Sequence, residues 1–156
     1  QWAWADGQGA RGDAWCKNAS NVVRPDAVLP AHNAPLGMDF APAGDGAIAS
    51  HGDMLVALHG SWNRDVPDGY GVTRLAFGGP GGVPTGEQVK VLAHAGAGAK
   101  FPNNMRPVDV KFNGTGVAYV SSDTTDEVLV LRATGAPPPP SPPPGEPSPA
   151  PPPPGP

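Results

Sequence analysis

APLGMDF, residues 34–40, and RPVDVKF, residues 106–112, share one pattern of apolar and polar positions. Each is followed by a glycine-containing turn and a second apolar run, MLVALHG (54–60) in the first copy and VAYVSSD (117–123) in the second. Short runs of alternating apolar and polar residues are typical of half-buried β-strands. The chain therefore contains two copies of a strand-turn-strand unit, a pattern typical of propeller blades.

Further β-rich runs extend both copies. The predicted strands are 36–40, 54–58, 72–77 and 89–92 in the first copy, and 108–112, 117–120 and 128–131 in the second. The first copy reaches four strands, the number in a propeller blade, whereas the second shows only three. No segment has a sustained helical period. We predict an all-β core, a partial propeller of about two blades spanning residues 36–134, with residues 1–35 leading in from a preceding blade.

The C-terminal segment, residues 135–156, has a different composition. The chain holds 23 prolines, most of them in GAPPPPSPPPGEPSPAPPPPGP, which contains no large apolar side chain to bury. Proline fixes an extended backbone with few amide donors. We expect this segment to be a polyproline II stalk outside the core.

Charge, sequons and cysteine content bear on the compartment. The formal net charge is −4 and the basic residues are scattered, which argues against a nucleic-acid-binding face, and no apolar run is long enough to cross a bilayer. The sequons at Asn18 and Asn113, beside a serine- and proline-rich tail, predict a secreted, extracellular or cell-wall glycoprotein.

Cys16 is the only cysteine, so it is either a buried thiol or pairs with a partner outside this chain. The chain opens on Gln1, and we expect it to come from a longer polypeptide.

The turn LHGSWNRDVPDGYGV, residues 58–72, carries side chains that an ordinary turn does not need. Turns favour Gly, Pro, Asn and Asp because these residues tolerate the required backbone angles, a purpose that His59, Trp62 and Arg64 do not serve. Successive strands of a meander reverse direction, so alternate loops lie at one end. We therefore expect one face, suited to a planar polyanion or a sugar, to gather residues 32–33, 59–64, 103–106 and 122–126.

HNAPLGMDF, HGDMLVALHGSWNRDVPDGYGVTRLAF and MRPVDVKFNGTGVAYVSSD resemble the C-terminal part of the sorbosone and pyranose dehydrogenase family, relatives of the soluble quinoprotein glucose dehydrogenases. The resemblance runs from about Asp13 to Leu131, and HGSWNR is its most specific piece. It implies a six-bladed propeller that binds pyrroloquinoline quinone (PQQ) with calcium and oxidises a sugar. The tail is similar to hydroxyproline-rich glycoproteins.

The resemblance implies that this chain supplies one wall of a cofactor site, and the residue types agree. A flat tricarboxylate needs guanidinium forks, amide donors and a ring to pack on. The candidate cofactor-binding residues are His59, Trp62, Asn63, Arg64 and Arg106. Each also has a structural interpretation. Trp62 covers the end of a sheet, Asn63 holds the turn, Arg64 pairs with Asp65 or Asp68, His59 is a hydrogen-bonded strand-end residue, and Arg106 bonds a neighbouring carbonyl.

Catalytic and metal-binding residues are not assigned. The family's general base belongs to an earlier blade, so none of the four histidines is a candidate base, and the chain alone is expected to be inactive. The segment SSDTTDE is either a calcium site or a solvated turn, while Asp39, Asp53 and Asp109 are expected at outward positions.

Two functions fit these observations. One is the C-terminal portion of a secreted PQQ-dependent sugar dehydrogenase, whose partners are a sugar and the remaining blades. The other is a structural glycoprotein of an extracellular matrix or filament, in which a propeller bead is linked to neighbouring chains through the proline-rich tail.

Overall fold

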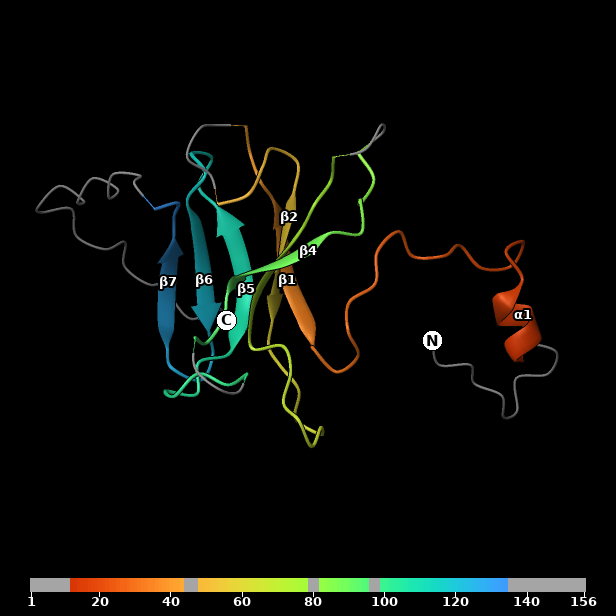
Figure 1. Cartoon of the computed structure of the whole chain (residues 1–156), viewed down its shortest axis with the longest axis horizontal. Coiled ribbons are helices and arrows are strands. Elements are labelled where there is room, and N and C mark those ends of the chain that lie inside the picture. Colours follow the sequence, from red (N-terminus) through yellow and green to blue (C-terminus); the bar gives the residue numbers. More distant parts are fainter. Residues whose placement is uncertain (1–11, 44–47, 79–81, 96–98, 135–156) are drawn as a thin grey trace, which may run out of the picture.

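The computed structural model describes residues 12–43, 48–78, 82–95 and 99–134, and within them the chain forms two antiparallel sheets (Figure 1). The first sheet has the order β1-β2-β3-β4 and the second β5-β6-β7. The strands are β1 (Pro35–Phe40), β2 (Met54–Leu58), β3 (Gly71–Leu75), β4 (Gln88–Leu92), β5 (Pro107–Phe112), β6 (Ala118–Ser122) and β7 (Glu127–Leu131). The predicted all-β core of two sheets is confirmed, with four strands in the first sheet and three in the second.

One short helix, α1 (Asp13–Lys17), was not predicted. It has only five residues and its N-cap, Gly12, makes no side-chain cap hydrogen bond. A helix of little more than one turn is too short to produce a readable apolar period. It lies in the lead-in segment and leaves both repeat copies in their predicted strands.

Strand pairing places the two repeats in the same register. In the first copy Met38 pairs with Val56, and in the second Val110 pairs with Val120. Each pairing also contains an irregularity just after the first proline of the repeat. Counting from these pairs, His59 and Asp123 hold equivalent positions, each one residue beyond the end of its strand.

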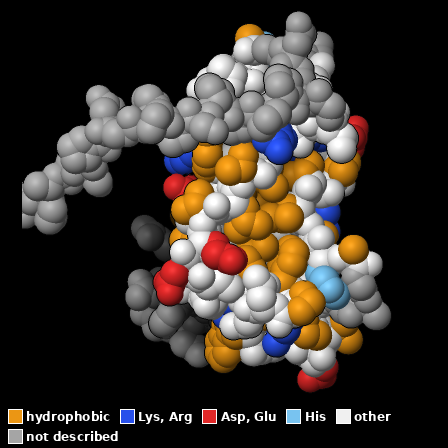
Figure 2. All heavy atoms as spheres, turned by 90° about the vertical axis from the view of Figure 1, so that its left-hand side faces the viewer, with side chains coloured by type: hydrophobic (Ala, Val, Ile, Leu, Met, Phe, Trp, Pro, Cys, Tyr) orange, Lys and Arg blue, Asp and Glu red, His pale blue; other side chains and the backbone are white. Residues whose placement is uncertain are grey.

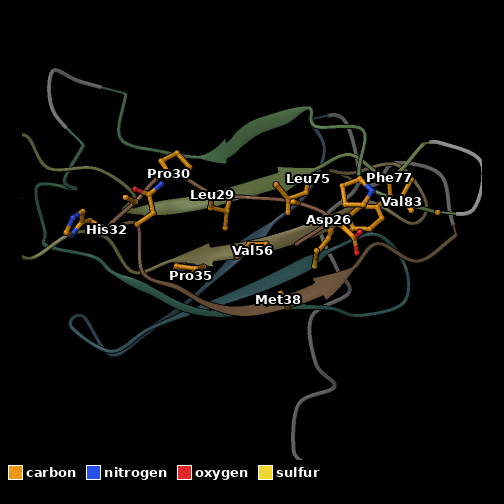
Figure 3. Close-up of a pocket in the computed structure, with 16 residues that line it drawn as sticks. Asp26, Leu29, Pro30, His32, Pro35, Met38, Val56, Leu75, Phe77 and Val83 are labelled. Carbon is orange, nitrogen blue, oxygen red and sulfur yellow. The ribbon is translucent and has the colours of Figure 1, made fainter. Parts of the chain in front are cut away.

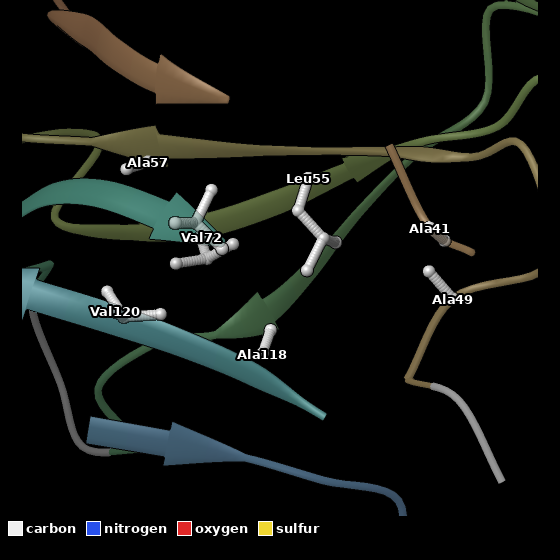
Figure 4. Packing of buried hydrophobic residues seen from close by; sticks show 8 residues of the cluster. Ala41, Ala49, Leu55, Ala57, Val72, Ala118 and Val120 are labelled. Atoms are coloured by element: carbon white, nitrogen blue, oxygen red, sulfur yellow. The ribbon is translucent and has the colours of Figure 1, made fainter. Parts of the chain in front are cut away.

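The main core lies between the two sheets (Figure 4). The first sheet contributes Leu55, Ala57 and Val72, and these pack with Val110, Ala118 and Val120 of the second. The alternate residues of β2 point to the other face of the first sheet, where Val56 and Leu58 form a second cluster with Leu75. The first sheet is therefore apolar on both faces.

The first strands of the two repeats, β1 and β5, lie against each other. A Cβ on Gly37 would lie 2.6 Å from the Asp109 Cα, so only glycine permits this approach. The Phe112 backbone N–H donates to Asp39 Oδ2 at 2.9 Å, and Lys111 Nζ donates to the Met38 carbonyl at 2.8 Å. The joint between the sheets combines apolar packing with these hydrogen bonds.

The expectation that Asp39 and Asp53 face outward is wrong. Asp39 is half-buried at the joint of the two sheets. Asp53 is buried, and its two carboxylate oxygens accept hydrogen bonds from the backbone of Ser50 at 3.1 Å and of Phe77 at 2.9 Å. Both carboxylates satisfy backbone donors that the sheet ladders leave unpaired.

The lead-in segment crosses the outer face of the first sheet. Ala27 and Leu29 pack against the second apolar cluster, and Gln88 Nε2 donates to the Val28 carbonyl at 2.7 Å.

Cys16 is half-buried, which leaves both interpretations of its thiol open. No helix in the described ranges is long and apolar enough to cross a membrane. The predicted stalk, residues 135–156, lies outside the described residues.

Candidate functional site

The turn between β2 and β3 is built by its own hydrogen bonds. The Ser61 N–H donates to the Asp68 carbonyl at 2.9 Å, and the Asp68 N–H donates to Ser61 Oγ at 3.0 Å. The Tyr70 hydroxyl donates to the Ser61 carbonyl. Gly60 has φ of 93°, and a Cβ there would lie 2.5 Å from the Tyr70 ring. Gly60 and Ser61 are therefore explained by the geometry of the turn, which leaves Trp62, Asn63 and Arg64 as its outward part.

Arg106 fastens this turn to the second sheet. Its Nε donates to the His59 carbonyl and its Nη2 to the Gly60 carbonyl, both at 2.9 Å. The guanidinium also lies over the Tyr70 ring, 5.4 Å from its centroid. The planar guanidinium offers two N–H donors at a fixed spacing to the two adjacent carbonyls, a geometry that a lysine ammonium does not have. The structural interpretation of Arg106 is confirmed, and its part in cofactor binding stays a prediction that rests on Nη1 and the positive charge.

His59 makes a second link between the sheets. Its Nε2 lies 3.0 and 3.1 Å from the two carboxylate oxygens of Asp123. The hydrogen bond from His59 holds the pKa of Asp123 below its ordinary value of 3.8, against a partial loss of solvation, and the charge of Arg106 acts in the same direction. The His59 ring is thereby oriented, with Nδ1 as the nitrogen that Asp123 does not use.

Arg64 joins the turn to the lead-in segment. Its Nη1 lies 3.3 Å from the Ala31 carbonyl and 3.3 Å from Asp68 Oδ2. The predicted alternative of pairing with Asp68 is confirmed. At 3.3 Å and with both side chains partly exposed, the contact is a weak surface pair.

Trp62 and Asn63 are the exposed tip of the turn. Trp62 is 85% exposed, so the interpretation that it covers the end of a sheet is wrong for the part of the chain that the structure describes. Asn63 is also exposed. An indole face that packs on nothing in the described ranges is available to a flat partner.

The expected meeting of four loops on one face is confirmed. The Gly60 N–H donates to the Asn33 carbonyl at 3.0 Å, and Thr124 Oγ1 donates to the Asn104 carbonyl at 2.7 Å. Together with the Arg106 and Asp123 contacts, these bonds join residues 32–33, 59–64, 103–106 and 122–126.

Sequence reasoning missed Asp123 and Tyr70 as individual residues. Asp123 stands where the first copy has His59 only by the strand pairing, because the matched runs MLVALHG and VAYVSSD set Ser122 against His59. Tyr70 carried no signal in the sequence, since its contact depends on how the turn closes. Within the described ranges, no group of three or more His, Cys, Asp or Glu side chains is placed to hold a metal ion.

Comparisons with known proteins place this arrangement in a family. The PQQ-dependent pyranose dehydrogenase of Coprinopsis cinerea is 34% identical over 155 residues, which is 87% of this chain and 20% of that relative. The solved holo form of the PQQ domain of the Coprinopsis cinerea pyranose dehydrogenase matches with a TM-score of 0.63 and 33% identity, over 80% of this chain and 32% of that one.

A second solved structure is similar. The calcium structure of the Trichoderma reesei enzyme of carbohydrate-active family AA12 matches with a TM-score of 0.65 and 28% identity, over 81% of this chain and 30% of that one. The chain thus spans about a fifth of the curated relative and about a third of these solved chains. The model of the TrAA12-like family matches residues 1–134, and the chain belongs to that family.

Proposed function

We propose that this chain is the C-terminal portion of a PQQ-dependent sugar dehydrogenase, a six-bladed propeller in which it contributes two blades and one wall of the cofactor site. The observation that carries the proposal is the exposed Trp62-Asn63-Arg64 tip, fastened to the second sheet by Arg106 and Asp123. The similarity to a pyranose dehydrogenase PQQ domain supports it.

The residues fit such a cofactor as one wall. The tip offers an exposed indole face, an amide and a guanidinium, which are the groups that a flat tricarboxylate needs. Arg106 departs from the expected role, because two of its nitrogens serve backbone carbonyls. Its charge still favours an anion nearby.

In this mechanism the chain's residues bind and orient. Trp62, Asn63 and Arg64 would hold the cofactor, Trp62 through its indole face and the other two through their N–H donors, and Asp123 holds the His59 imidazole in one orientation. Arg106 fixes the backbone that carries them, so little order is lost on binding. PQQ, when bound with calcium, supplies the electron acceptor for sugar oxidation.

One wall does not make an enzyme. Positioned proton transfer is worth about 10²- to 10⁴-fold in rate, and we assign no base in this chain. An open wall also binds weakly, because the opposing contacts and the water-poor enclosure are missing. We therefore expect this chain alone to be inactive and assign the activity to the whole protein.

We further propose that the protein is a secreted glycoprotein modified at Asn18 and Asn113. Both asparagines are exposed and stand in turns. The alternative function, a propeller bead of an extracellular matrix or filament, is favoured by the proline-rich composition of residues 135–156.

The test uses the full natural protein loaded with PQQ and calcium. We expect dye reduction with at least one aldose of a panel, and PQQ-dependent quenching of Trp62 fluorescence that disappears in Trp62→Phe. A folded, quinone-loaded protein that oxidises no aldose contradicts the dehydrogenase and favours the bead.

A further inference from the structure

Two surfaces of the molecule are apolar. A pocket of about 880 Å³ lies between the lead-in segment and the outer face of the first sheet, and its described lining includes Leu29, Val56 and Phe77 but no lysine or arginine (Figure 3). The side on which β7 lies shows a band of hydrophobic side chains (Figure 2). Two cations suited to an anionic ligand lie elsewhere, at the end of the sheets where the four loops meet.

Tyr70 is the ring on which this end is built. It is 3% exposed and has φ of 49°, which is uncommon for a residue with a side chain. Its hydroxyl donates to the Ser61 carbonyl, and its ring lies against Gly60. The turn that carries Trp62 therefore fixes the ring in place.

Both cations lie over this ring. Arg106 Cζ is 5.4 Å and Lys100 Nζ is 5.6 Å from the ring centroid. A cation within about 6 Å of an aromatic centroid is attracted by the ring. Both residues belong to the connection between β4 and β5, and β4 ends at Leu92 beside Val72 at the start of β3. The strand order therefore brings this connection to the end of the sheet where the turn between β2 and β3 lies.

The two cations keep unused hydrogen-bond donors. Arg106 bonds the carbonyls of His59 and Gly60 through Nε and Nη2, and its Nη1 bonds no described residue. Lys100 is exposed and forms no ion pair with a described carboxylate. The carboxylate of Asp123, which feels the charge of Arg106, is already bonded by His59. Two like charges that share one ring repel each other, and a bound anion relieves that repulsion.

We propose that Lys100 and Arg106 form a carboxylate-binding pair on this face, with Tyr70 as the residue that positions both. The inference rests on the proposed function and adds Lys100 and Tyr70 to the wall of the site. The carboxylate has two possible sources, the tricarboxylate quinone or an acidic sugar such as a uronic acid. In either case Lys100 Nζ and Arg106 Nη1 are the donors that the pair offers.

The first experiment measures the dissociation constant of PQQ in the full natural protein by equilibrium dialysis without sugar, so it needs no turnover. Lys100→Gln is compared with Arg132→Gln, which removes one charge elsewhere. Arg132 is exposed and follows β7, which begins beside Ser122 at this face and runs to the opposite end of the sheet. If the quinone supplies the carboxylate, Lys100→Gln weakens binding by about tenfold or more and Arg132→Gln leaves it unchanged.

The second experiment measures the binding of galacturonate and galactose to the quinone-free protein by calorimetry. If an acidic sugar supplies the carboxylate, galacturonate binds more tightly than galactose, and Lys100→Gln removes the difference. The pair is overturned if Lys100→Gln matches Arg132→Gln in both experiments, or if the folded protein binds neither PQQ nor galacturonate. Binding of galacturonate without PQQ keeps the pair and contradicts the dehydrogenase, so the two failures are distinguishable.

The positioning role of Tyr70 needs a test that separates it from stability. Tyr70→Phe keeps the ring, so it should retain carboxylate affinity while the lost hydrogen bond to Ser61 lowers the melting temperature. Tyr70→Leu removes the ring and should weaken affinity in the folded protein. The loss should be smaller in a Lys100→Gln background, because one of the positioned cations is then absent. An equal loss in both backgrounds, or the same affinity for Tyr70→Phe and Tyr70→Leu, overturns the positioning role.

Discussion

His59 and Asp123 occupy equivalent positions of the two repeats and bind each other, with Nε2 of His59 lying 3.0 and 3.1 Å from the two oxygens of Asp123. The same position of the repeat is a histidine in the first copy and an aspartate in the second. The pair joins the two sheets at the face where the exposed tip lies.

Asp123→Asn is expected to lower the melting temperature slightly at neutral pH. Because His59 holds the pKa of Asp123 below 3.8 in the folded protein, the carboxylate stabilises the fold above that value, and the contribution is lost as the pH falls through the lowered pKa. Thermal unfolding of both proteins over a pH series checks this. A gap between wild type and variant that persists after the pH has fallen well below the lowered pKa of Asp123 would contradict it.

Arg106→Ala is expected to destabilise the protein by about 2–3 kcal/mol, because two carbonyl groups lose charged donors. Arg106→Lys should recover only part of this, since an ammonium cannot reproduce the fork. Denaturant unfolding measures both, with Arg24→Ala as the control at an exposed arginine. Full recovery by lysine would show that only the charge matters.

Trp62→Ala separates binding from stability. The side chain is 85% exposed, so the free energy of unfolding should change by no more than about 0.5 kcal/mol. Loss of a stacking contact should weaken PQQ binding to the full protein by about tenfold. Titration with PQQ measures the affinity, and an unchanged dissociation constant would show that Trp62 does not contribute to PQQ binding.

Gly37→Ala tests the close approach of β1 and β5. A methyl group 2.6 Å from the Asp109 Cα must push the strands apart, at a cost of about 1–3 kcal/mol. Gly12→Ala is the matched control, because a Cβ there meets nothing within 4 Å. Equal melting temperatures of the two variants would rule out the close approach.

Asn113 should carry a nitrogen-linked glycan in the protein from its natural source. Thr115 Oγ1 donates to Asn113 Oδ1 at 2.8 Å in the exposed turn between β5 and β6. Thr115→Ala should abolish the glycan and Thr115→Ser should keep it, since either hydroxyl completes the sequon. The mass of the peptide that contains Asn113, measured before and after deglycosylation, shows whether the glycan is present. An unmodified peptide from the native protein would contradict glycosylation at Asn113.

The sequence by itself determined the strands, the two-copy repeat and the loops that share a face. Alternation of apolar residues and the placement of Gly, Asn and Pro are local properties, so they can be read without coordinates. The equivalence of His59 and Asp123 came only from the strand pairing, because matching MLVALHG with VAYVSSD in the sequence sets Gly60 against Asp123.

Only the tertiary structure decided which polar groups of the site are engaged and which are exposed. Arg106 could have bound an anion or a carbonyl, and the approach of the turn gave it the carbonyls of His59 and Gly60. Trp62 could have been buried, and it stands in solvent because its own sheet ends before reaching it. A side chain with several possible partners bonds to the one that lies near enough to it. For segments 40 or more residues apart in the chain, the packing of the sheets sets that distance. The contact of Arg106 with Gly60, at a separation of 46 residues, is an example.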